Sequence, residues 1–380
     1  MPSTLVGMVE PVAVAAAARE RARGDIIRLV NRGLGVREFS RAATQIIGRV
    51  VPFDGTCLLT VDPATLLPTG EFVENGLPDA AMVRLAEIEQ REPDYNKFTD
   101  LARAPQPAAS LSDVTAGNLD DSLRQRELRR PSGFEDELRA VCSGDTGTWG
   151  ALTLMREAKQ PHFTPADVHF VASLSAPLAE GLQRATLVGA TSGADDDEAG
   201  LLVLASDNTV EMSNRAGDRW LDEVGADDRS DGQLPTVIHA VAARTRRASA
   251  EADGGRNDGV ARARVRTAAG RWIIVRGSVL GDGDDAKVAI LIEAARAPEL
   301  APLIADAYGF TARERLITEL VAQGFSTKEI AERLHLSAYT VQDHLKSIFE
   351  KSGTGSRGDL VARLFFDHYA PRLSATPEAS

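Results

Sequence analysis

Apolar residues change their spacing along the chain, and these changes divide it into two mixed α/β stretches and a helical C-terminal end. Apolar faces at helical spacing predict one helix over residues 11–34 and a second over 37–51. Apolar runs between turn residues predict antiparallel strands at residues 55–62, 69–73, 137–142 and 148–155. Thr164, as an N-cap before Pro165, begins a further helix, which should run to about Leu187 with a kink at Pro177.

Residues 200–296 form a second mixed stretch. Two short strands, 201–205 and 209–212, flank a turn at Asp207-Asn208, and Asn214 caps the helix that follows. A short helical stretch over 236–242 and a polar loop lead to three strands, at residues 260–266, 271–280 and 287–293. This order predicts an antiparallel sheet with helices on one side. Between the two stretches, the acidic residues 187–199 are predicted to form a linker.

From residue 310 the pattern becomes that of four short helices. The first three should begin at the N-caps Thr311, Ser326 and Ser337, and a Glu three residues after each of the first two completes a capping box. The apolar stripe of the first helix comprises residues 316, 317, 320 and 321. Only about three residues, 335–337, separate the second helix from the third. This spacing predicts a helix-turn-helix; Arg357 begins the fourth helix.

The third helix of this segment should have a buried and an exposed face. Val341, Leu345 and Ile348 recur at helical spacing and are expected to be buried. In a helix-turn-helix, the N-terminal part of the second helix of the pair enters the major groove. Four outward side chains have the donors and acceptors that base edges require: Tyr339, Gln342, Asp343 and Lys346. Three more suit phosphate contacts: Thr340, Lys351 and Arg357.

These motifs resemble the LuxR/GerE-type helix-turn-helix family. The resemblance is carried by residues 311–314, 324–331 and 334–337, and by Thr340-Val341, His344-Leu345, Ile348, Lys351 and Ser356-Arg357. It implies an all-α, four-helix DNA-binding domain over residues 305–373, with Gln342, Asp343 and Lys346 facing bases. The family commonly has Lys where this chain has Gln342, which lowers the nonspecific attraction to DNA. The resemblance also implies dimerisation through the last helix, residues 359–368.

The first mixed stretch, residues 37–186, resembles a GAF domain of the kind found before this DNA-binding module in actinobacterial regulators. The matching segments are residues 51–55, 60–63, 67–69, 148–152 and 163–168. Residues 200–296 resemble a PAS domain in their strand order. Both folds usually enclose a small pocket between a sheet and helices. The two resemblances therefore imply sensing of a small-molecule, redox or partner signal, dimerisation, or both, with the effector unnamed.

Charge is unevenly distributed over the 380 residues. The formal net charge is −12, whereas residues 309–374 hold nine basic and eight acidic residues, a balance of +1. The excess acid therefore lies before Gly309, in a part that would repel phosphate. The two cysteines, Cys57 and Cys142, form no CxxC motif and suggest free thiols in a reducing cytoplasm. No apolar run reaches the ~18 residues of a membrane span, and no secretory signal is evident.

Candidate chemistry outside the helix-turn-helix is sparse. Cys57 could ligate a haem or attach a chromophore, but a buried structural thiol is the preferred interpretation. His162 and His169 are seven residues apart, a spacing that is poor for a shared metal ion, and His239 has no histidine near it in the sequence. The acidic turn 281–285 lacks the distal Glu of an EF-hand calcium loop. No P-loop and no nucleophile–base–acid set is present. The sequence thus predicts no metal, no cofactor and no enzyme activity.

Taken together, these patterns predict a multidomain α+β protein with an N-terminal helix (residues 1–36), two antiparallel-sheet sensor domains, the all-α helix-turn-helix domain and a disordered tail (374–380). The expected function is that of a one-component, cytoplasmic transcription regulator. It would bind double-stranded DNA as a homodimer, with RNA polymerase as a further partner and no membrane association. Two alternatives stay open: a protein-docking adaptor that uses the last domain, and an enzyme that carries a regulatory tail.

Overall fold

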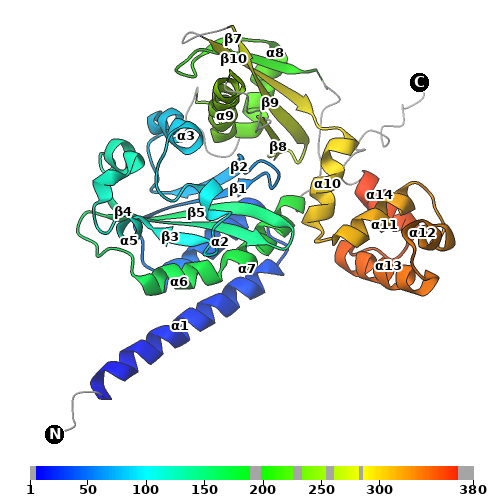
Figure 1. Cartoon of the computed structure of the whole chain (residues 1–380), viewed down its shortest axis with the longest axis horizontal. Coiled ribbons are helices and arrows are strands. Elements are labelled where there is room, and N and C mark those ends of the chain that lie inside the picture. The colour runs from blue at the N-terminus through cyan, green and yellow to red at the C-terminus, as the bar shows by residue number, and fades with distance from the viewer. Residues whose placement is uncertain (1–5, 189–197, 226–232, 254–260, 282–285, 367–380) are drawn as a thin grey trace, which may run out of the picture.

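The computed structural model describes residues 6–188, 198–225, 233–253, 261–281 and 286–366. They form a first sheet unit (residues 6–188), a second sheet unit (198–294) and a helical C-terminal unit (310–366), which the chain reaches through α10 (Ala297–Ala307) (Figure 1). Of the segments interpreted above, residues 189–197 of the linker, 282–285 of the acidic turn and 367–380 lie outside the described residues. Among the described helices, none is long and apolar enough to cross a membrane.

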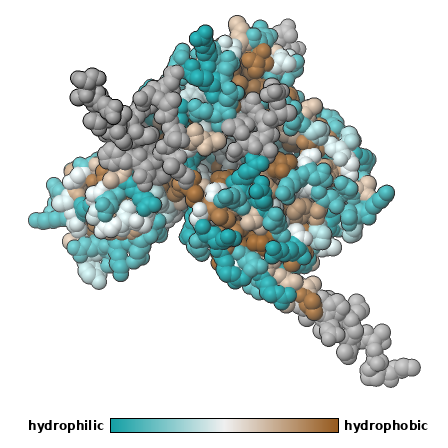
Figure 2. Space-filling model, turned by 180° about the vertical axis from the view of Figure 1, so that it is seen from behind, coloured by the Kyte–Doolittle hydropathy of each residue, from teal (hydrophilic) through white to brown (hydrophobic). Residues whose placement is uncertain are grey.

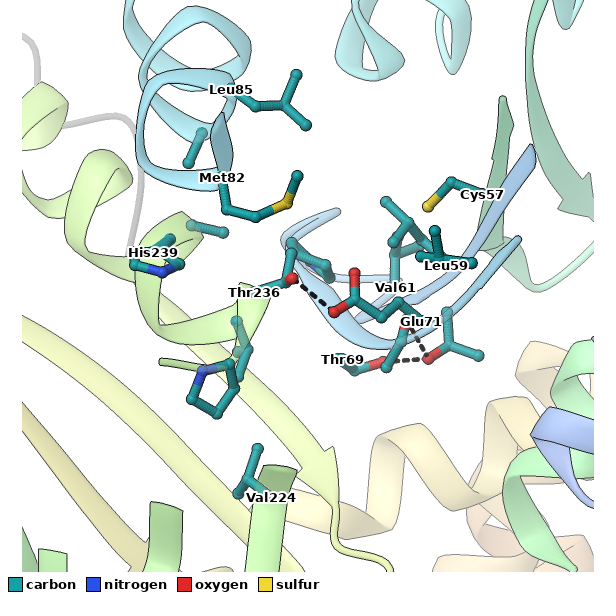
Figure 3. Close-up of a pocket in the computed structure, with 18 of the residues that line it drawn as sticks. Cys57, Leu59, Val61, Thr69, Glu71, Met82, Leu85, Val224, Thr236 and His239 are labelled. Carbon is teal, nitrogen blue, oxygen red and sulfur yellow. Dashed lines mark hydrogen bonds between the residues drawn. The ribbon is translucent and has the colours of Figure 1, made fainter. Parts of the chain in front are cut away.

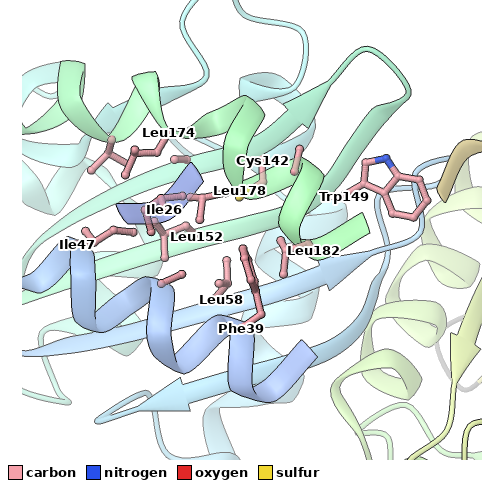
Figure 4. Packing of buried hydrophobic residues seen from close by; sticks show 14 of the residues in the cluster. Ile26, Phe39, Ile47, Leu58, Cys142, Trp149, Leu152, Leu174, Leu178 and Leu182 are labelled. Carbon is pink, nitrogen blue, oxygen red and sulfur yellow. The ribbon is translucent and has the colours of Figure 1, made fainter. Parts of the chain in front are cut away.

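The first sheet unit is built on five antiparallel strands in the order β2-β1-β5-β4-β3. The strands are β1 (Gly55–Val61), β2 (Pro68–Glu74), β3 (Ala108–Ser110), β4 (Phe134–Gly144) and β5 (Gly147–Glu157). Four helices cover one face of this sheet: α1 (Val6–Val30), α2 (Val36–Gly48), α6 (Pro165–Ser173) and α7 (Ser175–Leu187). Phe39, Leu58, Leu152 and Leu178 meet in the core between them (Figure 4). The N-terminal half of α1 projects beyond the unit (Figure 1).

Helices α2 and α7 approach each other closely because Gly181 lies where α7 crosses Phe39. A Cβ atom at this position would stand 1.9 Å from the Phe39 Cζ atom. The sequence predicted a single helix over residues 164–187 with a kink at Pro177, whereas the structure has two separate helices. The helix breaks at Leu174, so that Pro177 lies in the first turn of α7. There, its missing N–H group and its ring disturb no helical hydrogen bond.

The opposite face of the first sheet carries charged groups in its interior. The segment between β2 and β4 covers it and contains α3 (Met82–Arg91), α4 (Phe98–Leu101) and α5 (Leu111–Val114), with short turns at Asp79–Ala81, Leu119–Asp121 and Gln125–Arg129. Glu137 of β4 accepts hydrogen bonds from Arg124 at 2.7 Å and from Arg129 at 2.8 Å. Burial alone would raise the pKa of Glu137, but the surrounding arginines lower it well below its usual range. Arg139, also on β4, pairs with Glu89 at 3.0 Å.

The second sheet unit has the same strand order when its strands are counted from their own start. Its antiparallel order is β7-β6-β10-β9-β8. If β6 is counted as the first strand of this unit, the order is 2-1-5-4-3, which is also the order of the first sheet. The strands are β6 (Gly200–Leu204), β7 (Val210–Ser213), β8 (Arg262–Arg266), β9 (Trp272–Leu280) and β10 (Lys287–Ala294). Helices α8 (Arg215–Gly225) and α9 (Thr236–Asp253) pack on one face around Trp220, Ile238 and Val241. Exposed apolar residues, among them Leu201 and Met212, lie on this unit, and Figure 2 shows a hydrophobic patch at the top of the molecule.

The two sheet units are joined by polar contacts as well as by packing. Asp62, at the end of β1, is 1% exposed and accepts hydrogen bonds from the backbone and side chain of Arg264 on β8, the closest at 2.5 Å. On the other side of the junction, Arg244 of α9 donates to Gln90 of α3 at 2.7 Å. Helix α9 thus lies between its own sheet and the first unit.

Helix α10 connects the second sheet unit to the C-terminal unit but packs against the first. Leu300, Leu303 and Ile304 are buried in the hydrophobic core of the first unit. Gln183 of α7 donates a hydrogen bond to the Asp306 carbonyl oxygen, and Glu299 pairs with Arg276 of β9. The C-terminal helices follow directly: α11 (Ala312–Ala322), α12 (Thr327–Leu334), α13 (Ala338–Ser352) and α14 (Arg357–Phe366).

The predicted strands and the four C-terminal helices are confirmed, with strand ends shifted by up to three residues, whereas β3 and α3 were not predicted. Other helical expectations need correction. The stretch predicted over 236–242 continues to Asp253 as the 18-residue α9. Helix α10 was not predicted. In α11, Leu316 of the expected apolar stripe is 44% exposed, whereas Glu314 and Thr318 are buried.

Candidate nucleic-acid interface

Helices α12 and α13 form a tight helix-turn-helix. Ser326 caps α12 by accepting a hydrogen bond from the Glu329 backbone N–H, and Ser337 caps α13 by accepting one from the Thr340 N–H. Between the helices, His335 ends α12 in a left-handed conformation with φ 54°. A left-handed residue at this position reverses the chain in the few residues available. The third expected cap, Thr311, closes a capping box with Glu314 at the start of α11.

One face of α13 is buried in the C-terminal unit. Val341, Leu345 and Ile348 are at most 5% exposed, and they pack with Ile317 and Ile330 of the two preceding helices. A buried aliphatic face at i, i+4 and i+7 fixes the rotation of the helix about its axis. The opposite face is therefore presented to solvent in a defined orientation.

That opposite face carries the side chains predicted to read bases. Gln342, Asp343 and Lys346 are all exposed, and Tyr339 is 73% exposed. These exposures take the whole chain into account, so the sheet units leave this face of α13 uncovered. Gln342 and Lys346 also line a shallow depression with Thr327 and Glu350. Their contacts with bases remain a prediction, which the exposed arrangement permits.

The three residues predicted to contact phosphates form hydrogen bonds within the C-terminal domain. Thr340 is half-buried, and its hydroxyl lies 2.8 Å from that of Ser337. Lys351 donates to the Gly309 carbonyl at 3.0 Å and to Glu314 at 2.7 Å. Arg357 donates to the Phe325 carbonyl at 2.7 Å and to the Thr327 hydroxyl at 2.8 Å. Each therefore has a structural role, and its phosphate contact stays a prediction.

A buried carboxylate, predicted only to cap α11, braces α13 against α11. Glu314 is 3% exposed and accepts hydrogen bonds from the Thr311 N–H, from Ser347 at 2.7 Å and from Lys351 at 2.7 Å. Burial alone would raise the pKa of Glu314, but the hydrogen bonds from Lys351, Ser347 and Thr311 lower it to about 2. The capping box was visible in the sequence, whereas no local signal linked Glu314 to residues 33 and 37 positions later.

A comparison with protein families identifies this unit. A family model described as "Bacterial regulatory proteins, luxR family" matches residues 309–364, the segment that contains the four helices and the exposed face of α13. The C-terminal unit is similar to this family and is called the LuxR-type domain below. The matched residues agree with those that carried the resemblance in the sequence, and they do not extend into either sheet unit.

Two curated relatives are each similar to this chain over a short segment. Response regulator Rre1 of Synechocystis sp. is 44% identical over 52 residues, which are 14% of this chain and 22% of that protein. Transcriptional regulatory protein UhpA of Escherichia coli is 44% identical over 55 residues, 14% of this chain and 28% of that protein. The chain thus spans less than a third of the length of either relative. Both relatives are named as regulators rather than enzymes.

Solved structures add little about the two sheet units. The structure of Escherichia coli SdiA covers 90% of this chain and 94% of its own, at 13% identity and with a TM-score of 0.30. A TM-score this low carries no argument about the fold of the sheet units.

The other candidate residues lie far from the LuxR-type domain. Cys57 is half-buried on β1 and lines a cavity, and burial raises the pKa of its thiol to about 12. His162 and His169 are both exposed, whereas His239 is buried on α9. Over the described part of the chain, no group of three or more His, Cys, Asp or Glu side chains is arranged to hold a metal ion.

Proposed function

We propose that this protein is a transcription regulator that binds double-stranded DNA through the LuxR-type domain. The observation that carries the proposal is the exposed face of α13, with Gln342, Asp343 and Lys346 held outward by the buried aliphatic face. Gln can bond adenine, Lys can reach the acceptors of guanine, and Asp can accept from the amino group of cytosine. The curated relatives, which are named as regulators, support the same role.

The regulator acts as a homodimer on paired half-sites. Two copies of α13 must lie about one helical turn apart, ~34 Å, to enter successive major grooves. Helix α14, whose last expected residues lie outside the described part of the chain, is our candidate for the dimer contact. RNA polymerase is the expected further partner at a promoter, and the cytoplasm, where bacterial DNA lies, is the expected location.

The two sheet units act as GAF-like and PAS-like sensors of a small-molecule, redox or partner signal. Their identical strand order, together with the motifs of the first unit, supports this assignment. Binding of an effector would alter the geometry in which the dimer holds its two α13 helices, and so would change operator affinity. Their buried junction with α10 provides a physical connection for that change.

The test begins with selection of bound sequences from random double-stranded DNA, followed by titration at fixed salt. Lys346→Ala should weaken binding to the selected sequence by ~1–3 kcal/mol, because it removes one base contact. Lys287→Ala, which removes the same charge from the second sheet unit, is the matched control and should leave affinity unchanged. If no sequence is enriched, or if both variants bind like the wild type, the DNA-reading role is refuted and the adaptor alternative gains support.

A further inference from the structure

A large cavity lies where the first sheet unit meets the second. Its volume is ≈ 1170 Å³, which exceeds what a drug-sized ligand needs. The outer face of β1 and β2, helix α3, the start of α9 and the β6–β7 turn contribute its walls (Figure 3). Residues of both units therefore face the same space, which neither unit encloses alone.

The wall contributed by the first unit is largely apolar. Leu59 of β1 and Met82 and Leu85 of α3 point into the space, and Cys57 lies deeper along the same strand (Figure 3). All four side chains are half-buried, so each retains surface that a ligand can cover. Methionine adapts its shape readily to a neighbouring molecule. This wall favours an apolar body.

The second unit closes the cavity with the first turns of α9. Thr236 donates a hydrogen bond to Glu71 of β2 at 2.8 Å, which connects the two units across the cavity (Figure 3). Leu234, Val237 and His239 line the space beside this bond. A molecule in the cavity would thus contact both units at once.

Three arginines that line the cavity are paired with carboxylates of the protein. Arg139 pairs with Glu89, Arg129 donates to Glu137, and Arg264 pairs with Asp62. Binding a multiply charged ligand would require breaking such pairs, and a buried charge that loses its partner is costly. This compensation favours an uncharged ligand.

Neutral polar groups supply the remaining chemistry. Burial and the nearby Arg246 lower the pKa of His239 to about 4, so its imidazole is uncharged at neutral pH. Asn208 lies 3.3 Å from His239 through its amide nitrogen and is 3% exposed. Its amide oxygen is buried and accepts no hydrogen bond from the part of the chain that the structure describes. A buried acceptor without a hydrogen bond carries a free-energy cost, and a donor on a bound ligand would remove that cost.

We propose that this cavity binds a small, uncharged, mostly apolar organic molecule that carries at least one hydrogen-bond donor. Its apolar body lies against Leu59, Met82 and Leu85, and its donor reaches the amide of Asn208. Calling this molecule an effector rests on the proposed function, whereas the binding site itself does not. The cavity also extends to Leu303 of α10, the helix that leads to the LuxR-type domain.

N-phenylnaphthylamine is a suitable probe, because it is uncharged, apolar and carries one N–H donor, and its fluorescence rises in apolar surroundings. Anilinonaphthalene sulfonate has the same rings with an added negative charge. Titration of the full chain should show saturable binding of the first probe. The sulfonate should bind about tenfold more weakly, because Arg129, Arg139 and Arg264 of the cavity wall are already paired with carboxylates.

Three variants locate the bound probe. Leu59→Trp fills the cavity and should weaken binding of N-phenylnaphthylamine about tenfold or more. Leu201→Trp makes the same change at an exposed strand position of the second unit and should have no effect. Asn208→Gly keeps the left-handed backbone at φ 64° while removing the amide, and should weaken binding about fivefold. Because it needs no added volume, this variant tests the site even if Leu59→Trp fails to fold.

Absence of saturable binding to the wild type, equal binding to Leu59→Trp and the wild type, or tighter binding of the sulfonate would each overturn the proposal. If the protein selects a DNA sequence but binds no probe, the proposed function is supported and this inference is refuted. Probe binding that depends on Leu59 and Asn208 in a protein that selects no DNA would support the site and remove the proposed function.

Discussion

The brace between α11 and α13 can be tested by Glu314→Gln. The substitution keeps the size of the side chain, but it replaces one acceptor oxygen with an N–H₂ donor and removes the charge. In the wild type, the two carboxylate oxygens accept from Ser347 and from both Lys351 and the Thr311 N–H. In the variant, one of these donors must face the amide N–H₂, and Lys351 loses its ionic partner. The expected result is easier local opening of α13.

The size of the effect follows from the pKa of Glu314. Its value is about 2 in the folded protein, compared with an ordinary value of 4.5. Each pKa unit of this difference corresponds to ~1.4 kcal/mol. The ionised Glu314 would therefore stabilise the folded domain by about 3 kcal/mol if solvent screening were ignored. Because Lys351 is exposed, screening reduces this to about 2 kcal/mol. A change of about 2 kcal/mol corresponds to a roughly thirtyfold larger population of the open state, and hence to roughly thirtyfold faster exchange.

Hydrogen–deuterium exchange of peptides from α13 is the appropriate assay, since it reports local opening within a large protein. The folded pKa of Glu314 lies below its unfolded value, so its contribution is complete above about pH 4.5 and is lost as the pH falls toward 2. The thirtyfold difference between wild type and Glu314→Gln should therefore be present at neutral pH. It should shrink as the pH falls through this window, because the wild-type carboxyl becomes protonated.

Glu329→Gln is the matched control. Glu329 occupies the same position in the capping box of α12, but its side chain is exposed and accepts its hydrogen bond from the Ser326 N–H of its own capping box. This variant should leave exchange in α13 almost unchanged. Equal exchange in Glu314→Gln and wild type would refute the brace. An equal effect of the two substitutions would show that capping alone, and not the contact with Lys351, holds α13 in place.

Three further predictions concern packing and the junction between units. Ile348→Ala removes a fully buried side chain of α13 and should destabilise the LuxR-type domain by ~2–5 kcal/mol, measured by the same exchange experiment. Gly181→Ala should lower the melting temperature of the first sheet unit, at a cost of ~1–3 kcal/mol, and Phe39→Leu should partly restore it by making room for the added methyl group. Asp62→Asn leaves the buried Arg264 without its ionic partner and should cost ~3–5 kcal/mol, seen in calorimetry as earlier separation of the two sheet units; a single unchanged transition would contradict the role of this ion pair.

The elements that the sequence predicted well are those whose signals are local. The LuxR-type domain is made of short helices with capping residues and buried positions at helical spacing, and its contacts are largely between neighbouring helices. The same spacing placed Gln342, Asp343 and Lys346 on the exposed face of α13. The strands of both sheets were recognisable because apolar runs alternate with turn residues.

Helices whose stability depends on distant contacts were underestimated. The second half of α9 is rich in Arg and Ala and looked like a polar loop, yet Arg244 and Arg247 both donate to Gln90 of the first unit. Helix α10 contains Pro302, which argues against a helix when the sequence is considered alone. Its burial against the first unit compensates for the lost hydrogen bond.

The candidate site was predicted in its exposed part but not in its support. The Glu314–Lys351 contact joins residues on two different helices, and only the folded arrangement shows that the Lys351 ammonium group reaches Glu314. The cavity between the sheet units was equally invisible, because its walls come from segments that are far apart in the sequence.

The placement of α10 has a mechanical consequence for how two such chains could engage DNA. A segment that links domains through open solvent would let each recognition helix swing and accept operators of varied spacing. Here, Leu303 and Ile304 are anchored in one unit while Glu299 is held by Arg276 of the other. Base pairs inserted between two half-sites should therefore be poorly tolerated. Because α10 is fixed to both sheet units, the recognition helices cannot move apart to reach half-sites that are farther from each other.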